Sequence, residues 1–330
     1  MKAAFIRETG PAEKIIYGDL PEPTPGPEDI VIRTSAVSVN PIDTYIRNGA
    51  NYWPLPQPYI IGCDVAGTVV AVGREARRFR VGDRVWGSNQ GLMGRQGTFA
   101  EYVCGDENWF YATPSGVSDE AVAACALVGI TAHLGLFQNA RLQAGELVFI
   151  NGGSGGVGSL VIQLAKAAGA RVIATAGSDE KCQICRELGA DLAINYRTQD
   201  VAAKTKEFAP EGVNVYWETT REPQFDAMVA LLAERGRIVL MAGRDARPIF
   251  PVGPFYVKGC SMSGFVMFKA TQSEQRVCAE DLNRWLLGGQ LRARIGREFP
   301  LSEAAAAHRL QEENTLKAAG TLAGKIILRP

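Results

Sequence analysis

The chain has few histidines, the commonest metal ligands, and no surplus of charge of either sign. Its 330 residues include only two histidines, and 35 Lys and Arg balance 35 Asp and Glu. A net charge of zero gives no strong field to attract nucleic acid or an anionic membrane. The balance therefore disfavours nucleic acid as a partner.

The sequence also shows no signal-peptide pattern in its first residues and no long apolar run. The first ten residues, MKAAFIRETG, have no apolar core followed by small residues, unlike a signal peptide. No stretch approaches the roughly 20 apolar residues of a membrane span. The seven cysteines are odd in number and scattered, which is typical of reduced thiols. We therefore expect a cytoplasmic protein with no membrane partner.

The pattern of apolar residues predicts two domains of different fold. Residues 1–121 contain short apolar or alternating runs, such as Ile30–Val39 and Val65–Val72, separated by Pro and Gly clusters. Over residues 122–268 strands and helices alternate, which predicts an α/β Rossmann domain with a doubly wound parallel sheet. Residues 269–330 return to a mixed pattern. We expect them to complete the β-rich domain, into which the Rossmann domain is inserted.

The expected elements follow from apolar periodicity, capping residues and Gly or Pro punctuation, and Ser118 is the expected N-cap of the first long helix. The expected strands are Met1–Ile6, Phe99–Val103, Leu147–Asn151, Arg171–Thr175, Asp191–Asn195, Val213–Trp217, Arg237–Met241 and Lys325–Leu328. The expected helices are Asp119–Gln138, Gly156–Ala168, Asp179–Leu188, Pro223–Arg235, Ser273–Leu287 and Ser302–Glu313.

A glycine-rich segment follows the expected strand Leu147–Asn151 and opens a helix. Its glycines fit the G-x-G-x-x-G spacing, in which they allow a tight turn, close approach of a pyrophosphate, and helix packing. The pyrophosphate would bind N–H groups at the positive end of the helix dipole. The predicted contacts are Gly153, Ser154, Gly155, Gly156, Val157 and Gly158.

The strand after this loop ends with a small neutral residue, Ala176. An NAD site usually carries Asp or Glu there to hold the ribose 2′-hydroxyl. A neutral strand end with Ser178, Lys181 and Tyr196 nearby suits a 2′-phosphate instead. We expect Asp179–Glu180 to face solvent from the first helical turn. The sequence thus predicts NADPH as the cofactor.

Cys182 and Cys185 form an isolated C-x-x-C pair on the expected helix Asp179–Leu188. Without a second pair this spacing is poor evidence for zinc. We interpret the two side chains as buried thiols on one helix face, with a redox role as the alternative.

Several motifs together resemble the medium-chain dehydrogenase/reductase family over essentially the whole chain. They are Gly62-Cys63-Asp64-Val65-Ala66-Gly67, Val70-Ala71-Val72-Gly73, Val81-Gly82-Asp83-Arg84-Val85 and the GGSGGVG loop. The resemblance implies a GroES-like catalytic domain around the inserted Rossmann domain.

Many members of that family are zinc alcohol dehydrogenases, and this sequence departs from them at the ligand positions. Cys63-Asp64 stands where they carry His-Glu, and Asn40 where they carry the first ligand cysteine. The four-cysteine lobe for structural zinc is absent too. Catalytic zinc takes about three protein ligands, so we expect no metal.

The segment Val39–Gly49 looks like the N-P-(V/I)-D-T-Y-I-R-x-G stretch of quinone oxidoreductases, the zeta-crystallin branch. Within that branch, Asn40, Tyr45 and Thr131 correspond to residues near the nicotinamide and the substrate. Ser178, Lys181 and Tyr196 correspond to contacts of the 2′-phosphate, in agreement with the argument above. The further cofactor contacts that we expect are Gly243, Phe265 and Val266.

Three departures from this branch stand out. The strand end at Val215–Thr220 lacks the usual Asp-x-x-Gly pattern, and the loop Ser88–Gln96 is longer than expected at the substrate mouth. His133 stands where relatives more often have an aromatic residue. Packing on an apolar helix is its favoured role, with proton donation as the alternative.

We expect transfer of a hydride from NADPH to a quinone or another conjugated carbonyl, without zinc. Asn40, Tyr45 and Tyr52 would donate hydrogen bonds to the oxygen on which charge develops. The alternative for Tyr52 is that it and Trp53 are rim aromatics that only shape an apolar pocket. The alternatives are an enal, enone or enoyl-thioester reductase and, in another class, a non-catalytic NADPH-binding protein of crystallin or RNA-binding type. Self-association is expected through the strand around Tyr256–Phe265, with a dimer favoured.

Overall fold

The computed structural model describes residues 1–50, 53–317 and 319–330. The chain forms two compact units. The first unit comprises Met1–Ile130 and Ala270–Pro330, and the second comprises Thr131–Lys269. The expected boundary between residues 121 and 122 lies near the start of helix α2 (Asp119–His133), whose last residues belong to the second unit.

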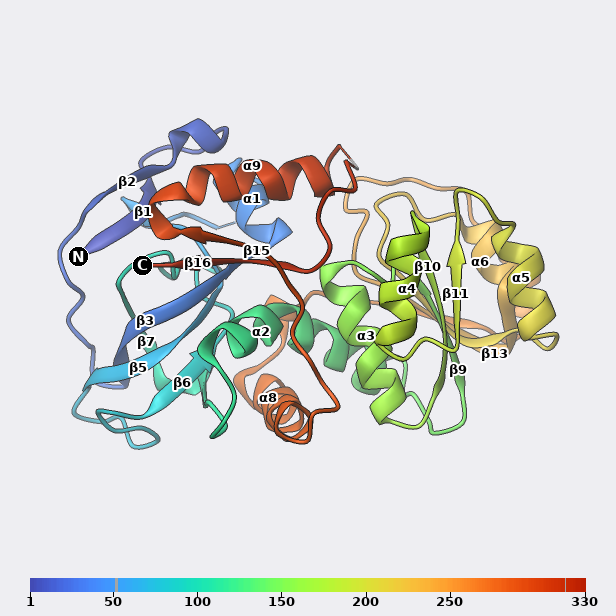
Figure 1. Ribbon diagram of the computed structural model, residues 1–330, viewed down its shortest axis with the longest axis horizontal. Coiled ribbons are helices and arrows are strands. Elements are labelled where there is room, and N and C mark those ends of the chain that lie inside the picture. Colours follow the sequence, from blue (N-terminus) through green and yellow to red (C-terminus); the bar gives the residue numbers. More distant parts are fainter. Residues whose placement is uncertain (51–52, 318) are drawn as a thin grey trace. The chain divides into compact units, whose positions relative to one another are not determined.

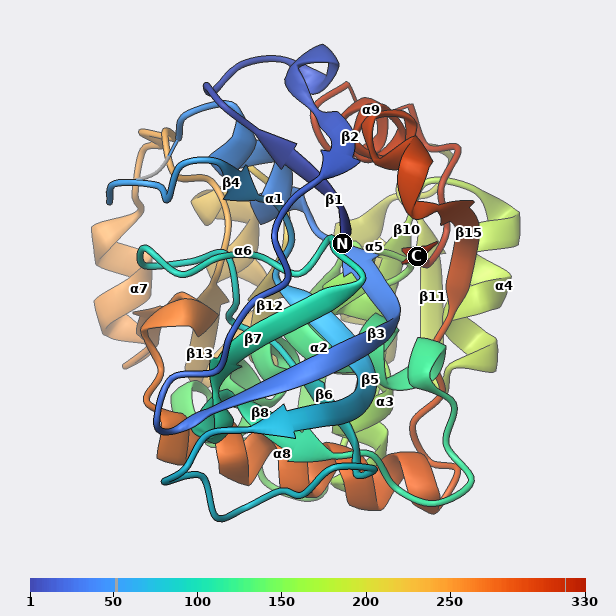
Figure 2. The same cartoon turned by 90° about the vertical axis from the view of Figure 1, so that its left-hand side faces the viewer.

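The first unit is built around a β-sheet to which both ends of the chain contribute. Its strand order is β15-β16-β3-β5-β6-β8, with β7 also paired to β3, and a smaller sheet has the order β2-β1-β4. Figure 2 shows β3, β5, β6 and β8 side by side. Strand β16 pairs antiparallel with β3, so the last strand of the chain lies in the larger sheet beside a strand from its N-terminal part.

The elements of the first unit before α2 are β1 (Lys2–Ile6), η1 (Ala12–Lys14), β2 (Ile16–Asp19), β3 (Asp29–Val39), α1 (Pro41–Arg47), β4 (Tyr59–Ile60), β5 (Asp64–Val72), β6 (Arg84–Gly87), β7 (Tyr102–Asp106), η2 (Glu107–Trp109) and β8 (Phe110–Ala112). Its C-terminal elements are α8 (Gln272–Leu287), β15 (Ile295–Pro300), η5 (Leu301–Glu303), α9 (Ala304–Thr315) and β16 (Lys325–Arg329).

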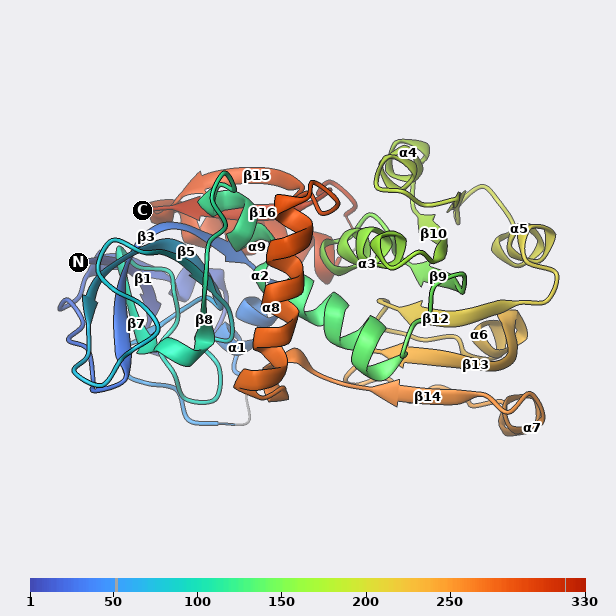
Figure 3. The same cartoon turned by 90° about the horizontal axis from the view of Figure 1, so that it is seen from below.

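The second unit is a parallel sheet of strand order β11-β10-β9-β12-β13-β14, part of which is visible in Figure 3. All of its strand pairs are parallel. The order reverses between β9 and β12, and such a switch point is where open α/β sheets bind ligands, at the carboxyl ends of the strands.

The elements of the second unit are the π-helical segment η3 (Leu134–Asn139), β9 (Leu147–Asn151), α3 (Gly156–Ala167), β10 (Arg171–Ala176), α4 (Asp179–Glu187), β11 (Leu192–Asn195), α5 (Val201–Phe208), β12 (Val213–Glu218), α6 (Phe225–Leu231), β13 (Leu232–Leu240), α7 (Val252–Val257), β14 (Ser261–Gly264) and η4 (Met267–Lys269).

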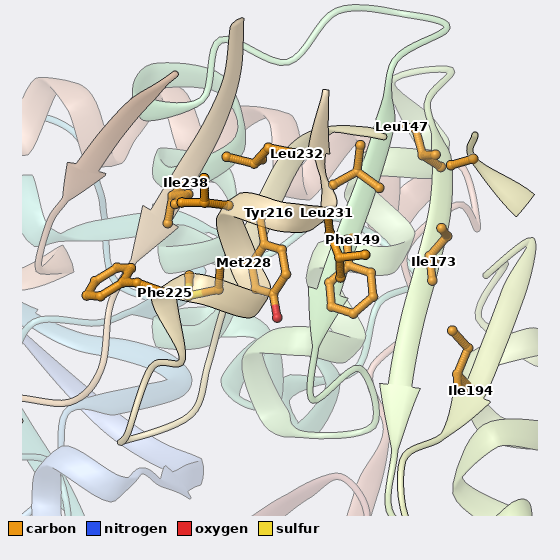
Figure 4. Packing of buried hydrophobic residues seen from close by; sticks show 13 residues of the cluster. Leu147, Phe149, Ile173, Ile194, Tyr216, Phe225, Met228, Leu231, Leu232 and Ile238 are labelled. Atoms are coloured by element: carbon orange, nitrogen blue, oxygen red, sulfur yellow. The ribbon is translucent and has the colours of Figure 1, made fainter. Parts of the chain in front are cut away.

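Alternate residues of the central strands are buried on opposite faces of this sheet. One face contributes Phe149, Ile173 and Tyr216 to a cluster with Met228 of α6, which Figure 4 shows. Phe149 and Tyr216 stack with ring centroids 4.6 Å apart. The intervening residues of β9 and β10 are also fully buried, beneath α3 and α4. Helices therefore cover both faces, which is why these strands are continuous apolar runs.

The structure confirms the α/β class, the inserted parallel sheet and most expected elements within one or two residues. Ser118 caps α2, because its hydroxyl accepts a hydrogen bond from the N–H of Ala121 at 3.2 Å. Several expectations were wrong in position, and the strand expected to start at Arg237 begins at Leu232. The strand expected at Phe99–Val103 is β7, which begins at Tyr102. The helix expected over Pro223–Arg235 ends at Leu231, because Leu232 is extended and pairs with Val213 of the sheet.

The segment Tyr256–Phe265 was expected to be one strand and is not. Tyr256 lies in α7, and only Ser261–Gly264 form β14. The expectation that no apolar stretch approaches the length of a membrane span was wrong for the helix that begins at Asp119. Residues Asp119–Asn139 are long and apolar enough to cross a membrane by length and composition, but 78% of their most apolar window is buried inside the fold. This burial identifies the segment as a core helix.

Candidate functional site

The glycine-rich loop connects β9 to the N-terminus of α3 in the second unit, as predicted. Gly158 packs so closely that a Cβ there would lie 2.2 Å from the carbonyl oxygen of Gly152. A Cβ on Gly155 would have its nearest neighbour at 3.5 Å, so the chain leaves space beside this residue. Close packing at the start of the helix thus requires glycine at position 158, the third of the motif. The space beside Gly155, the second glycine of the motif, suits the approach of a ligand.

The start of α3 presents backbone donors to that space. The first intrahelical bond runs from the N–H of Ser159 to the carbonyl of Gly155 at 3.0 Å. The N–H groups of Gly156, Val157 and Gly158 therefore precede the helical ladder and can bind an anion, whereas the N–H of Gly155 bonds to the carbonyl of Gly152 at 3.3 Å. The loop fits a pyrophosphate by this geometry.

A group of polar side chains surrounds the carboxyl ends of β10 and β11. Ser178 caps α4 by accepting a hydrogen bond from the N–H of Lys181 at 3.3 Å. The hydroxyl of Tyr196 lies against Gly177, 2.6 Å from the point where a Cβ would be. Partial burial and the neighbouring Arg197 guanidinium lower the pKa of Lys181. Two cations thus lie close together, and a bound dianion would relieve their repulsion.

Arg197 was not among the predicted site residues. It directly follows Tyr196, and both come after β11, so its place in the chain was a usable signal. The acidic pair Asp179–Glu180 is exposed, as predicted, and Asp179 accepts a hydrogen bond from Asn195 at 2.8 Å. Ala176 is buried at the strand end. No carboxylate therefore stands at the position that would hold a ribose 2′-hydroxyl.

The remaining predicted cofactor contacts follow β13 and β14. Gly243 has a φ of +81°, and a Cβ there would lie 2.7 Å from a carbonyl oxygen of Arg221. The N–H of Phe265 bonds to the carbonyl of Leu240 at 3.3 Å, and Val266 is exposed. The N–H of Phe265 is therefore already engaged within the sheet.

In the first unit, Asn40 lies at the centre of a buried polar network. Its amide nitrogen donates to Asp64 at 2.8 Å, and its amide oxygen accepts a hydrogen bond from the ammonium of Lys325. The same ammonium donates to the carbonyl of Val39 at 2.8 Å. Asn40 is fully buried, and both ends of its amide are bonded within the protein. This arrangement favours a role in orienting Asp64 and Lys325 over direct contact with a substrate.

Asp64 is held by several further donors. The hydroxyls of Ser38 and Ser88 each donate to it at 2.7 Å, and the N–H of Leu127 donates at 3.1 Å. Burial raises the pKa of Asp64 and lowers the pKa of Lys325, while each charge favours the ionised form of the other. The network thus places one buried cation among carboxyl groups.

Asp43 belongs to the same network. Its carboxylate accepts a hydrogen bond from the N–H of Asn40 at 2.7 Å, which completes a capping box at the start of α1. Complete burial, and then the nearby Asp64 charge, raise the pKa of Asp43 to about 7, although the adjacent Cys63 thiol opposes the shift. Burial also raises the pKa of Cys63, so this thiol stays protonated.

The other predicted catalytic residues lie on separate segments. Tyr45 is half-buried on α1, and Thr131 is buried on α2 at the start of the second unit. Tyr52 lies outside the described residues. His133 is buried with its ring 4.7 Å from Phe137, an arrangement that favours packing.

The loop Ser88–Gln96 folds inward in the first unit. The side chain of Gln96 bridges the chain by donating to the carbonyl of Pro58 and accepting from the N–H of Ile60, both at 2.8 Å. Asn89 is fully buried with a φ of +68°, and the guanidinium of Arg95 donates two hydrogen bonds to its main-chain carbonyl oxygen. Within the described structure neither amide atom of Asn89 has a hydrogen-bond partner. The loop was expected to stand out from the sequence alone, but Asn89 was not among the predicted site residues.

Cys182 and Cys185 are both buried on α4, which confirms the interpretation as helix-face thiols. Burial raises the pKa of each thiol, so neither has the thiolate character that redox use needs. Among the residues that the structure describes, no group of three His, Cys, Asp or Glu side chains could hold a metal ion.

Comparisons with known proteins agree with this architecture. Residues 26–115 match the family model of the alcohol dehydrogenase GroES-like domain, and residues 156–282 match that of zinc-binding dehydrogenases. The chain is 34% identical to a quinone oxidoreductase of Sus scrofa, over 97% of this chain and 94% of the relative.

Two solved structures illustrate the range of similar folds. A structure described as an NAD-dependent alcohol dehydrogenase has a TM-score of 0.90 and 30% identity, with all of both chains covered. The Escherichia coli quinone oxidoreductase complexed with NADPH has a TM-score of 0.87 and 25% identity, again over all of both chains. The fold is therefore shared by relatives with different cofactors, and the residues around the second strand of the sheet must discriminate between them.

Proposed function

Because this chain belongs to the quinone oxidoreductases of the medium-chain dehydrogenase/reductase superfamily, we propose that it is an NADPH-dependent reductase of quinones or other conjugated carbonyl compounds. The observation that carries this proposal is the cation pair Lys181 and Arg197, beside a strand end without a carboxylate. That arrangement suits a 2′-phosphate and leaves no acceptor for a ribose 2′-hydroxyl.

The residues of the second unit would hold the cofactor in two places. Backbone N–H groups at the start of α3 would bind the pyrophosphate, and the group Ser178, Lys181, Tyr196 and Arg197 would bind the 2′-phosphate. When bound, NADPH supplies a hydride, and a proton from solvent completes the reduction of a quinone to a hydroquinone. The protein contributes orientation and hydrogen bonds to the developing oxygen charge.

We propose Tyr45 and Asn89 as donors to the oxygen of the acceptor. Tyr45 is half-buried and carries a hydroxyl, while Asn89 carries a buried amide that needs a partner. An unpaired buried amide costs about 1–3 kcal/mol, so a ligand carbonyl or a water there would be stabilising. Asn40 is proposed to position Asp64 and Lys325, and Thr131 to lie beside the nicotinamide. Tyr52 keeps its predicted role as a further donor.

Catalysis without zinc is supported by the chemistry of the residues at the ligand positions. Asn40 is bonded to a buried ammonium, and Cys63 holds its proton. A divalent cation would have to compete with Lys325 for the same carboxyl groups. We therefore expect NADPH oxidation to be unaffected by chelators, and activity that is lost to a chelator and restored by zinc would contradict this part of the proposal.

The test of the proposed activity is a panel of acceptors. Purified protein is mixed with NADPH or NADH and with small quinones, enones, enals and enoyl-thioesters, and the loss of absorbance at the nicotinamide band is followed. NADPH-dependent turnover with quinones or enones supports the proposal, and a higher rate with quinones identifies them as the preferred acceptors. NADPH binding without any turnover would favour a non-catalytic role, for which RNA binding at physiological salt is the second assay.

We also propose a homodimer formed through β14 and α7. β14 is the last strand of its sheet, and Val252, Tyr256, Val257 and Met262 are exposed around it. An open edge with an apolar surface is a natural place for a second copy. Val257→Glu should give a monomer in sedimentation, whereas Val277→Glu, at an exposed position on α8, should leave the oligomer intact.

The seven cysteines are all free thiols. This state suits a reducing compartment, and we propose a cytoplasmic location on that basis.

A further inference from the structure

A buried carboxylate lies at the carboxyl end of β12, the strand end that departs from the family pattern. Glu218 is 2% exposed, and the amide nitrogen of Asn151 donates to its two carboxylate oxygens at 3.0 and 3.1 Å. A carboxylate can only accept hydrogen bonds. The amide nitrogen of Asn151 must therefore face Glu218, and its amide oxygen must point the other way.

That amide oxygen is bound by the neighbouring strand. The hydroxyl of Thr175, at the end of β10, donates to the oxygen of Asn151 at 2.8 Å. Having given its proton to Asn151, the hydroxyl can only accept from the N–H of Gly152, which it does at 3.0 Å. The main-chain oxygen of Thr175 accepts the N–H of Gly153 at 2.8 Å. One residue thus holds the first two amides of the glycine-rich loop.

The segment after β12 packs against the same loop. The hydroxyl of Thr219 donates to the carbonyl of Asn151, and a Cβ at Gly152 would lie 2.4 Å from that hydroxyl oxygen. The N–H of Thr220 donates to Glu218 at 2.6 Å. The carboxylate therefore fixes both the amide of Asn151 and the turn that covers the start of the loop.

We propose that Glu218, Asn151 and Thr175 are positioning residues for the cofactor, which set the phosphate-binding loop through a hydrogen-bond chain across β12, β9 and β10. The Glu218 carboxylate cannot donate a hydrogen bond, so it fixes the orientation of the Asn151 amide and, through it, the direction of the Thr175 hydroxyl. This inference rests on the proposed function only in that the loop binds NADPH.

Exchanging donor and acceptor between two of these residues tests the proposal. Asn151→Asp alone places two carboxylates against each other, and we expect the Kd for NADPH to rise about tenfold or more. Adding Glu218→Gln restores the chain, because the new amide nitrogen donates to Asp at position 151 and its oxygen still accepts from Thr220. The double variant should bind NADPH within about threefold of the parent.

Thr175 gives a matched pair of variants. Thr175→Ser keeps the hydroxyl and should retain the parent's affinity, while Thr175→Val removes both of its side-chain links and should weaken NADPH binding. Affinity is measured by quenching of protein fluorescence, without an acceptor, and thermal unfolding is recorded for each variant.

The outcomes separate positioning from simple core stability. Recovery of both affinity and thermal stability in the double variant supports the chain as described. Recovery of the melting temperature without recovery of affinity, or an Asn151→Asp variant that binds like the parent, would overturn it. If the parent itself fails to bind NADPH, the proposed function falls and takes this inference with it.

Discussion

The ammonium of Lys325 donates a hydrogen bond to the side-chain oxygen of Asn40, a residue 285 positions earlier in the chain. The same amide donates to Asp64, so the cation and the carboxylate bind opposite ends of one side chain. This relationship ties the last strand, β16, to the turn between β3 and α1.

Lys325→Met is therefore expected to be strongly destabilising. It leaves the carboxyl groups without their buried cation, and breaking such a pair costs about 3–5 kcal/mol. The free energy of unfolding from urea titration checks this value. Combining Lys325→Met with Asp64→Asn should cost less than the sum of the two single changes, because neither Lys325 nor Asp64 is then left without its partner charge. Additive losses would contradict the coupling. The Kd for NADPH should stay close to that of the parent, because the second unit carries the phosphate contacts.

His308 on α9 should make stability fall in acid. Its complete burial, and then the Arg47 charge, lower its pKa to about 3, from an ordinary value of 6.5. The unfolded chain therefore takes up this proton below pH 6.5, while the folded chain does so only near pH 3. Between these values the group's contribution to stability is lost by up to about 1.4 kcal/mol per pH unit as the pH falls.

The measurement compares the parent with His308→Leu, which cannot titrate, in urea unfolding at several pH values from 4 to 8. Asp43 acts in the opposite direction, since its raised pKa favours the folded state in acid. Asp43 is present in both proteins, so its effect cancels from the difference. A difference between the two proteins that does not change between pH 4 and 6 would exclude the role of His308.

Lys181 and Arg197 should determine the choice between the two nicotinamide cofactors. Lys181→Ala and Arg197→Ala are each expected to raise the Kd for NADPH about tenfold or more, with little effect on NADH, because only NADPH carries the 2′-phosphate. Arg186→Ala, which removes another exposed cation of α4, is the control. Equal losses of affinity for NADPH and NADH would show that Lys181 and Arg197 do not bind the 2′-phosphate.

Asn89 should reveal a trade-off between stability and activity. Asn89→Gly relieves a left-handed backbone conformation and removes a buried unpaired amide, so the free energy of unfolding should rise by about 1 kcal/mol. If the amide binds the oxygen of the acceptor, kcat/KM for the quinone should fall about tenfold while the KM for NADPH stays the same. A variant that is both more stable and fully active would remove Asn89 from the substrate site.

The phosphate loop could be predicted because its signal is local. The motif, the preceding strand and the following helix are contiguous, and the βαβ alternation fixes their arrangement. The strand ends at Ala176 and Asn195 were placed within a residue for the same reason. The neutral end of β10 then followed from one position in the sequence.

Contacts between distant segments could not be predicted. Nothing near Lys325 in the sequence indicates that its charge is buried, or that its partner is Asn40. The pairing of Glu218 with Asn151 likewise depends on β12 lying beside β9, across the switch point of the sheet. Arg197 is an intermediate case, because it becomes a neighbour of Lys181 only when β10 and β11 pair.

The attachment of β16 to β3 also sets an order of events during synthesis. The residues of the second unit form one continuous stretch and can acquire their fold while the ribosome is still adding residues behind them. The network around Asn40 must wait until Lys325 has left the exit tunnel, so the N-terminal residues spend most of translation with Asp64 lacking its cation. The N-terminal part of the first unit is therefore synthesised before the second unit but completed after it.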